Sequence, residues 1–317
     1  MFPDDQGRRC VRSLEKAMTA SSPIALITGA STGIGASYAD RLAARGYDLI
    51  INARDEAKLR ERAVELADRH GSSVEILAAD LGQAAGVEAV ERRLARGDVA
   101  LLVNNAGIAV AGQTIEMSPD EMEGMLRLNM ISAARLAQAA AKAMVAKGRG
   151  DIINIASVAS LTADRPGVSV AYSATKAFLL SFSEGLDMEV ANKGVFVQAV
   201  LPGITVTPIW DKSGIDLAPL TDRAMPVDDM VDAALSGFDQ REKVTIPALA
   251  DAGLWEAFVE ARRALHPHLS LREPARRYGV TPLATARVGV VDRGHAVATA
   301  GGVSVGGLIA DLADGDA

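Results

Sequence analysis

Cysteine and histidine are scarce in this chain of 317 residues, and long apolar runs are missing. The single cysteine, Cys10, excludes an internal disulfide, and the four histidines stand at none of the spacings typical of metal sites, such as HExxH. No apolar run approaches the roughly 18 residues of a membrane span, and the acidic pair Asp4 and Asp5 is unlike the start of a secretory signal. We therefore expect a cytoplasmic protein that binds neither metal nor membrane.

Clusters of basic residues are also missing. Asp and Glu number 40 against 33 Lys and Arg, which gives a net charge of −7, and no group of basic residues is denser than on the solvated face of a helix. This charge balance argues against nucleic acid as a partner. Hydrophobic residues make up 49% of the chain, which is enough for a sizeable core in one large domain or two smaller ones.

Short β-branched runs alternate with longer helical patterns from residue 23 to about residue 247. This alternation is typical of βαβ units around a parallel sheet, and most runs are continuously apolar, as expected for strands covered on both faces. We therefore expect a doubly wound, Rossmann-type α/β fold that binds ligands at the carboxyl ends of its strands. The seven strands are predicted to begin at Pro23, Tyr47, Val74, Val99, Asp151, Val195 and Lys243.

Two long helices are predicted in the second half of this region. The stretch SPDE (Ser118–Glu121) is a capping box with proline at the first helical position, so a helix begins here and ends near Gly148. A second helix runs from about Ala171 to Gly194. A further amphipathic helix is predicted over Asp251–Leu265.

The segment TGASTGIG (Thr28–Gly35) follows the first predicted strand and opens a helix. Its glycines are spaced GxxxGxG and not GxGxxG. Glycine lets backbone N–H groups approach an anion, and a helix N-terminus supplies free donors for a diphosphate. A plain strand-to-helix turn is the alternative. The residues expected to bind the cofactor here are Gly29, Ser31, Thr32, Gly33, Ile34 and Gly35.

The end of the second strand indicates which dinucleotide is bound. A carboxylate there would accept the ribose hydroxyls of NAD, but this chain has Arg54, whose guanidinium suits a 2′-phosphate. We therefore favour NADP(H) over NAD(H). Two features weaken this choice: Asp55 follows at once, and Thr32 stands where a second basic residue would have strengthened it. A solvent-facing Arg54 is the alternative.

In the stretch YSATK, Tyr172 lies four residues before Lys176, so the two side chains share one face of a helix. A free phenol has a pKa of about 10, and a nearby ammonium group favours the phenolate and lowers that pKa. Tyr172 is therefore a candidate acid or base. The YxxxK pattern alone also occurs by chance, as a half-buried tyrosine beside a surface lysine.

Further polar residues stand at predicted strand ends: Asn104-Asn105-Ala106-Gly107, Ser157 and Pro202-Gly203. Asn129 is a polar residue inside an apolar helix and needs a partner. Together, TGASTGIG, Asp80-Leu81, NNAG, Asn129, Ser157, YSATK and PGITVT occur in an order and spacing that resemble the short-chain dehydrogenase/reductase family, in its compact single-domain branch. The resemblance covers about residues 22 to 250. It implies a seven-stranded parallel sheet and a nicotinamide cofactor.

The resemblance also implies a tetrad of Asn129, Ser157, Tyr172 and Lys176. Tyr172 would protonate the substrate carbonyl oxygen as hydride arrives from the nicotinamide, and Ser157 would bind that oxygen. Lys176 would lower the tyrosine pKa and hold the nicotinamide ribose, while Asn129 would hold a water or a backbone group. Ser160 competes for the serine role, because the segment before Tyr172 is about two residues longer than the family leads us to expect.

The remaining cofactor contacts are also implied by the resemblance. Asp80 and Leu81 are expected at the adenine, and Asn105, Ala106 and Gly107 at the adenosine side. Turn and loop roles are the alternatives for Asp80, Asn105 and the Pro-Gly pair. The last set, expected at the nicotinamide amide or the diphosphate, is Pro202, Gly203, Thr205 and Thr207.

Substrate choice is expected to depend on the loop Pro208–Pro226, whose apolar residues favour a hydrophobic ketone, aldehyde or secondary alcohol over a sugar. A surface loop with a few packed anchors is the alternative. A 3-oxoacyl thioester reductase and a non-catalytic NADP-binding protein remain further alternatives. Among the apolar residues of the loop Pro208–Pro226 are Trp210, Ile215, Leu217, Leu220 and Met225.

We expect the chain to consist of four segments. Residues 1–20 are predicted to be a disordered extension, because Met18 reads as a natural start just before the first strand. Residues 21–250 form the dinucleotide-binding catalytic domain, and 251–280 a helical extension. No structure is predicted for residues 281–317. By resemblance, the helices from Ser118 and Ala171 pack against their copies in a homodimer or homotetramer, which their small residues permit.

Overall fold

The computed structural model describes residues 22–110, 112–164, 169–209 and 218–280. The chain divides into two compact units, Met1–Asp251 and Ala252–Ala317, and each is described by itself. The expectations for residues 1–20 and 281–317 lie outside the described residues. So do those for Trp210, Ile215 and Leu217.

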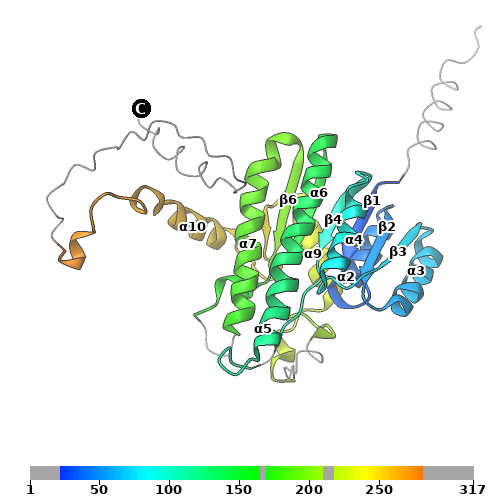
Figure 1. The fold of residues 1–317 in the computed structure, drawn as a ribbon, viewed down its shortest axis with the longest axis horizontal. Coiled ribbons are helices and arrows are strands. Elements are labelled where there is room, and N and C mark those ends of the chain that lie inside the picture. The colour runs from blue at the N-terminus through cyan, green and yellow to red at the C-terminus, as the bar shows by residue number, and fades with distance from the viewer. Residues whose placement is uncertain (1–21, 111, 165–168, 210–217, 281–317) are drawn as a thin grey trace, which may run out of the picture. The chain divides into compact units, whose positions relative to one another are not determined.

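The first unit is built on a seven-stranded parallel sheet with the strand order β3-β2-β1-β4-β5-β6-β7 (Figure 1). All seven predicted strands are present, and the doubly wound α/β fold is confirmed. The last strand is short, with 2 residues. The strands are β1 (Ile24–Thr28), β2 (Asp48–Ala53), β3 (Val74–Ala78), β4 (Val99–Asn104), β5 (Gly150–Ile155), β6 (Val195–Val200) and β7 (Val244–Thr245).

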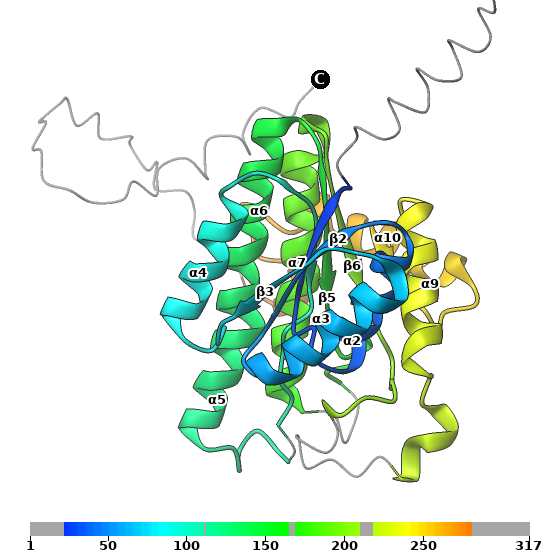
Figure 2. The same ribbon diagram turned by 90° about the vertical axis from the view of Figure 1, so that its right-hand side faces the viewer.

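Helices cover both faces of this sheet, as Figure 2 shows for α4 and α6 on one side and α2 and α9 on the other. Each layer buries its own apolar cluster against the sheet. One face carries α2 (Gly33–Ala44), α3 (Glu56–His70) and α9 (Val227–Asp239). The other carries α4 (Ala84–Leu94), α6 (Ala133–Lys147) and α7 (Val170–Val190).

The two apolar clusters explain why the strands are apolar throughout. In β1, Ala25 and Ile27 belong to the cluster under α2 and α9, whereas Leu26 belongs to the cluster under α4 and α6. All three side chains are fully buried. Successive side chains of a strand point to opposite faces, so a strand between two helical layers needs apolar residues at every position.

The helix predicted from Ser118 is interrupted. The capping box is present, with the Ser118 hydroxyl accepting from Glu121 N and the Glu121 carboxylate accepting from Ser118 N. The helix α5 (Pro119–Leu126) then passes into a π-helical turn, η1 (Arg127–Ser132), before α6 continues to Gly148. Asn129 lies in the π-helical turn. A π turn inside an α-helix is often found at a functional site.

Short 3₁₀ turns complete the first unit: η2 (Val158–Leu161), η3 (Ala191–Lys193) and η4 (Ala218–Arg223). The predicted stop at Gly194 is confirmed, because Gly194 takes a left-handed conformation with φ of 81° directly after η3. Such a conformation costs glycine little and other residues more, which makes glycine the usual end of a helix.

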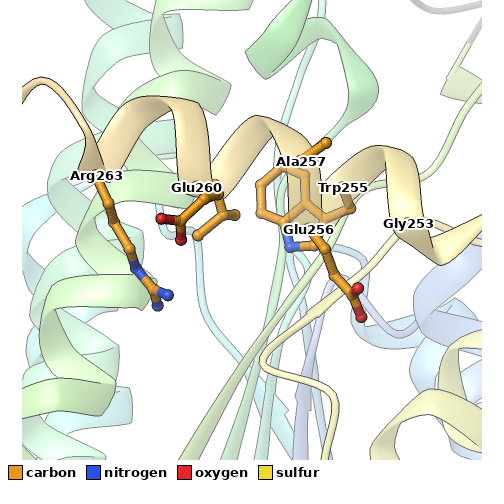
Figure 3. A pocket seen from close by; sticks show the side chains of 7 residues that line it. Gly253, Trp255, Glu256, Ala257, Glu260 and Arg263 are labelled. Carbon is orange, nitrogen blue, oxygen red and sulfur yellow. The ribbon is translucent and has the colours of Figure 1, made fainter.

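The second unit begins with α10 (Ala252–Arg263), which is the helix predicted over Asp251–Leu265, and continues with η5 (His266–His268) and η6 (Arg276–Tyr278). A hollow of about 510 Å³ runs along α10. All of its lining comes from this one helix, so we interpret it as a depression of the helix surface. Figure 3 shows the lining side chains, which are Gly253, Trp255, Glu256, Ala257, Val259, Glu260 and Arg263.

Candidate active site

A cavity of about 880 Å³ lies at the carboxyl ends of the strands of the first unit. Its walls come from the loops after β1, β2, β3, β4, β5 and β6 and from the first turns of α7. This is where ligands bind in open parallel sheets, and the volume is in the range of pockets for large organic ligands. The cavity therefore brings the motifs of the sequence together in one place.

The glycine loop after β1 forms one wall. Gly29 and Gly33 adopt φ values of +66° and +59°, which side chains with a Cβ rarely accept. At Gly35, an added Cβ would collide with the carbonyl oxygen of Gly29 and lie 2.6 Å from Asn105 Nδ2. Thr32, the residue before α2, makes no side-chain capping bond, and the first turn of α2 contains no acidic residue. The N-terminus of α2 thus presents open N–H donors that fit a diphosphate.

Thr28 connects this loop to the one after β4. Its hydroxyl accepts hydrogen bonds from the N–H groups of Asn105 (2.9 Å) and Ala106 (3.0 Å). In return, Asn105 Nδ2 donates to the carbonyl of Thr28 at 2.9 Å. The side chain of Asn105 therefore stabilises the loop, as the alternative interpretation held, while the residue also lines the cavity. Sequence reasoning missed Thr28, although a hydroxyl ending an apolar strand is a usable signal.

Arg54 is exposed after β2 and lines the cavity, as does Lys58 in the first turn of α3. Between them, Asp55 caps α3: its Oδ1 accepts from Lys58 N at 3.1 Å, and its Oδ2 lies 3.6 Å from Lys58 Nζ. The backbone hydrogen bond from Lys58 keeps the pKa of Asp55 below its usual value. Sequence reasoning missed Lys58, which stands four residues after Arg54.

Tyr172 and Lys176 lie one turn apart near the start of α7. Ser169 caps this helix by accepting from Tyr172 N at 3.4 Å, and Thr114 Oγ1 accepts from Ala171 N at 3.2 Å. Lys176 is 5% exposed, lies 5.7 Å from the centre of the Tyr172 ring and donates to the carbonyl of Ile155 at 2.9 Å. The predicted pairing of phenol and ammonium on one helix face is present.

The pKa values of this pair are set mainly by burial. Burial raises the pKa of Tyr172 to about 12, against the opposing effect of a hydrogen bond with Ser157. Burial lowers the pKa of Lys176 to about 8. Desolvation of the phenolate therefore holds the pKa of Tyr172 above that of a free phenol, and the expected lowering of this pKa by Lys176 stays a prediction. At neutral pH, Tyr172 is a protonated phenol.

Ser157 lies at the end of β5 and lines the cavity. Its hydroxyl accepts from Ala159 N at 3.1 Å, lies 3.4 Å from the carbonyl oxygen of Pro202 and hydrogen-bonds the phenol of Tyr172. Ser160, the alternative serine, is not part of the lining, and its buried hydroxyl has no partner among the described residues. The geometry therefore favours Ser157.

Asn129 is buried behind the cavity wall. Its Oδ1 accepts from Ile108 N at 2.9 Å, and its Nδ2 donates to the carbonyl of Ile108 at 2.8 Å and to Thr175 Oγ1 at 3.2 Å. A Cβ on Gly107 would lie 3.1 Å from Asn129 Oδ1 and 3.6 Å from Lys176 Nζ. Glycine at 107 therefore lets the loop after β4 approach both side chains, and Asn129 holds a backbone group.

Among the residues expected at the cofactor, Gly35 does not line the cavity, because it packs beneath the loop. Asn129 of the tetrad does not line it either. All the others do. They are Gly29, Ser31, Thr32, Gly33, Ile34, Arg54, Asp80, Leu81, Asn105, Ala106, Gly107, Ser157, Tyr172, Lys176, Pro202, Gly203, Thr205 and Thr207.

Few of the described residues that line the cavity are charged. Leu220 lines it as expected, whereas Met225 pairs with Thr205 in an isolated β-bridge and is not part of the lining. Of the described lining residues, only Arg54, Asp55, Lys58, Asp80 and Lys176 are charged. The lining also includes apolar residues that sequence reasoning did not single out, among them Val110, Val158, Ala159, Ile204 and Ile209.

Fold and cavity together define a Rossmann-type α/β protein with a cavity at the carboxyl ends of its strands. The model of the short chain dehydrogenase family matches residues 23–217, more than half of the chain. The chain belongs to this family of oxidoreductases. A short-chain dehydrogenase from Sphingobium yanoikuyae, solved in complex with NADPH, is 46% identical with a TM-score of 0.78, over 81% of this chain and 99% of that chain.

Two further relatives are similar over most of their lengths. The bulky-bulky ketone specific alcohol dehydrogenase from Comamonas testosteroni is 37% identical with a TM-score of 0.74, over 82% of this chain and 99% of that chain. The 3-oxoacyl-acyl-carrier-protein reductase FabG of Escherichia coli K12 is 36% identical over 192 residues, which are 60% of this chain and 76% of the relative.

The described ranges contain neither a membrane-spanning helix nor a candidate metal site. None of their helices has the length and apolar character needed to cross a bilayer. Within the same residues, no group of three or more His, Cys, Asp or Glu side chains is arranged to hold a metal ion.

Proposed function

We propose that this chain is an NADP(H)-dependent oxidoreductase that interconverts a hydrophobic ketone or aldehyde and the corresponding alcohol. The observation that carries the proposal is the joint placement of Tyr172, Ser157 and Lys176 in one cavity with the open N-terminus of α2. A hydride carrier and a proton donor are the two parts that carbonyl reduction needs. The cavity offers a site for the hydride carrier, and Tyr172 in its wall is the proton donor.

The contacts of the residues support the following proposed roles. The nicotinamide cofactor supplies or accepts the hydride when bound. Tyr172, protonated at neutral pH, gives its proton to the carbonyl oxygen, and the hydroxyl of Ser157, already bonded to the phenol, holds that oxygen. Lys176, fixed by the carbonyl of Ile155, holds the nicotinamide ribose, and Asn129 fixes the loop at Ile108.

The adenosine end favours NADP(H) for three reasons. Arg54 and Lys58 place two positive charges on the cavity wall. Asp55, the acid between them, is held by the N–H and ammonium groups of Lys58 and so is less free to accept the ribose hydroxyls of NAD. The relative from Sphingobium yanoikuyae was solved with NADPH. We assign the adenine to the wall formed by Asp80 and Leu81.

The substrate class rests on the apolar residues in the lining of the cavity. Charged side chains among the described lining residues lie at the adenosine end or, as Lys176, next to the tyrosine, so a neutral apolar substrate is favoured. A relative that is specific for bulky-bulky ketones supports this assignment. A 3-oxoacyl thioester is the second candidate, and it rests on the 3-oxoacyl reductase among the relatives.

The test is oxidation of NADPH by the purified protein with a panel of bulky ketones, aldehydes and 3-oxoacyl thioesters. Tyr172→Phe should reduce turnover by about 10²- to 10⁴-fold and leave NADPH binding unchanged. Normal turnover by this variant would contradict the assigned proton donor. Binding of NADPH without turnover of any carbonyl compound would favour a non-catalytic NADP-binding protein.

The cofactor assignment is tested separately with Arg54→Ala and Lys58→Ala. Each should raise the KM for NADPH about tenfold and leave the KM for NADH nearly unchanged, because NADH lacks the 2′-phosphate. Arg60→Ala is the matched control, since Arg60 lies on the same helix, pairs with Glu56 and does not line the cavity. Equal effects on both cofactors would contradict the 2′-phosphate contact.

A further inference from the structure

The π-helical turn η1 holds two walls of the cavity through two buried side chains. Ser132, its last residue, is 1% exposed. Ser132 Oγ lies 2.6 Å from the carbonyl oxygen of Leu81 and 3.0 Å from that of Arg127. A hydroxyl group has one proton to donate, and the shorter contact has the better distance for a hydrogen bond. Ser132 therefore donates to Leu81, which lies in the loop after β3.

The loop that Ser132 reaches forms the adenosine end of the cavity. Asp80 and Leu81 line it there, and Asp80 Oδ1 accepts from Gly82 N at 2.9 Å, which closes a tight turn. On the other side, the loop rests on the first turn of α4, because a Cβ on Gly86 would collide with the carbonyl oxygen of Asp80. The loop is therefore held between α4 and the hydroxyl of Ser132.

The same turn also holds the loop after β4. Asn129, three residues before Ser132, bonds both the N–H and the carbonyl of Ile108. Leu128, beside it, lines the cavity. One π-helical turn therefore contacts both the loop after β3, at Leu81, and the loop after β4, at Ile108. The hydrogen bond of Ser132 fixes the position of the main chain at Leu81.

We infer that Ser132 is a positioning residue for the adenine end of the cofactor. Its hydroxyl does not touch the cavity, and it acts by holding the main chain at Leu81 and, through it, the side chains of Asp80 and Leu81. This inference rests on the proposed function, which assigns the adenine to that wall. Loss of the hydroxyl leaves a buried carbonyl without this donor and lets the wall move, so adenosine binding weakens.

The experiment measures binding of adenosine 2′,5′-bisphosphate by calorimetry and of NADPH by fluorescence. The first probe lacks the nicotinamide, so it reports on the adenosine end alone. Ser132→Ala should weaken both by about 5- to 20-fold and change kcat at saturating NADPH by less than about twofold. Ser132→Thr keeps the hydroxyl and should bind both probes within about threefold of the wild type.

Ser183→Ala is the matched control. Ser183 is also a buried helical serine that donates to a carbonyl, Leu179 O at 2.6 Å, but it does not line the cavity or contact its loops. Its variant should lower the melting temperature to an extent similar to Ser132→Ala and leave affinity for both probes within twofold. A merely structural role for Ser132 would make the two variants indistinguishable in binding.

The outcomes separate this inference from the proposed function. Wild-type protein that binds neither probe overturns both. Wild-type protein that binds them, with a Ser132→Ala variant of equal affinity, overturns this inference alone. If Ser132→Ala does not fold, Ser132→Cys replaces it, because it keeps the size of the side chain and has only a weak donor. Unchanged affinity in that variant likewise overturns the inference.

Discussion

At the scale of single residues, the buried ammonium group of Lys176 lowers the free energy of unfolding at neutral pH. Burial lowers its pKa from 10.5 to about 8, so the folded state binds fewer protons than the unfolded state between these values. The penalty is fully present below about pH 8 and declines as the pH rises towards 10.5. The difference corresponds to about 3 kcal/mol as an upper limit.

Lys176→Met should therefore increase the free energy of unfolding at pH 7 by about 1–3 kcal/mol, since methionine fills a similar volume without a buried charge. Urea denaturation measures this. Lys142→Met, a change at an exposed position of α6, should stay within about 0.5 kcal/mol of the wild type. A less stable Lys176→Met protein would show that the hydrogen bond to Ile155 outweighs the burial of the ammonium group.

The same two pKa values predict opposite pH profiles for the two reaction directions. Tyr172, with a pKa of about 12, stays protonated at ordinary pH, so carbonyl reduction should be limited only by loss of the Lys176 charge above about pH 8. Alcohol oxidation needs a tyrosine that accepts a proton, so its rate should rise with pH. Lys176→Arg, which stays charged, should move the fall in reduction to higher pH. A reduction rate unchanged up to pH 10 would contradict this assignment.

The residues of the site could be predicted from the sequence where they belong to a recognisable motif. The glycines of the first loop, Tyr172 and Lys176 belong to dense motifs, and the structure brings them to one cavity. Lys58 and Ser132 stand in ordinary helical contexts, and only the folded chain shows what they contact. The pKa of Tyr172 could not be predicted, because it depends on burial and not on the spacing from Lys176.

At the scale of elements, the glycine loop depends on close contact between backbones. Gly35→Ala should destabilise the protein by about 1–3 kcal/mol and weaken NADPH binding more than tenfold, because the added methyl group collides with Gly29 and Asn105. Gly124→Ala is the control, since no atom lies within 4 Å of its added Cβ and alanine favours the helix. Differential scanning fluorimetry with and without NADPH measures both effects. Equal behaviour of the two variants would contradict the packing argument.

Strands were easier to predict than the interior of helices. Seven apolar runs predicted seven strands, because helices on both faces demand apolar residues at every position. The π-helical turn at Asn129 was not predicted. Its local sequence continues a helical pattern, and the polar side chains in it bond to loops that are distant in sequence, at Leu81 and Ile108. Tertiary contacts of this kind leave no periodicity to detect.

At the scale of the whole molecule, the predicted homodimer or homotetramer remains to be tested. Met188, on α7, is 80% exposed, and Ile131, in η1, is 53% exposed. If these helices pack against their copies, Met188→Asp should lower the molar mass measured by light scattering at micromolar concentration. Val64→Asp, at a 60% exposed position of α3, should not. A monomeric wild-type protein would contradict the prediction.

The strand order also separates the two ends of the cavity along the chain. The wall that carries Arg54, Lys58 and Asp80 is complete before β4 ends, whereas the apolar wall from Val110 to Leu220 comes after it. A crossover placed in β4 would therefore carry the side chains of the first wall without altering the second, provided that both parents keep the serine at 132 that holds the main chain at Leu81. On this arrangement, mutations that change the cofactor preference and mutations that change the substrate fall in different halves of the chain. Chimeras joined in β4 are therefore a way to engineer the cofactor preference or the substrate preference separately.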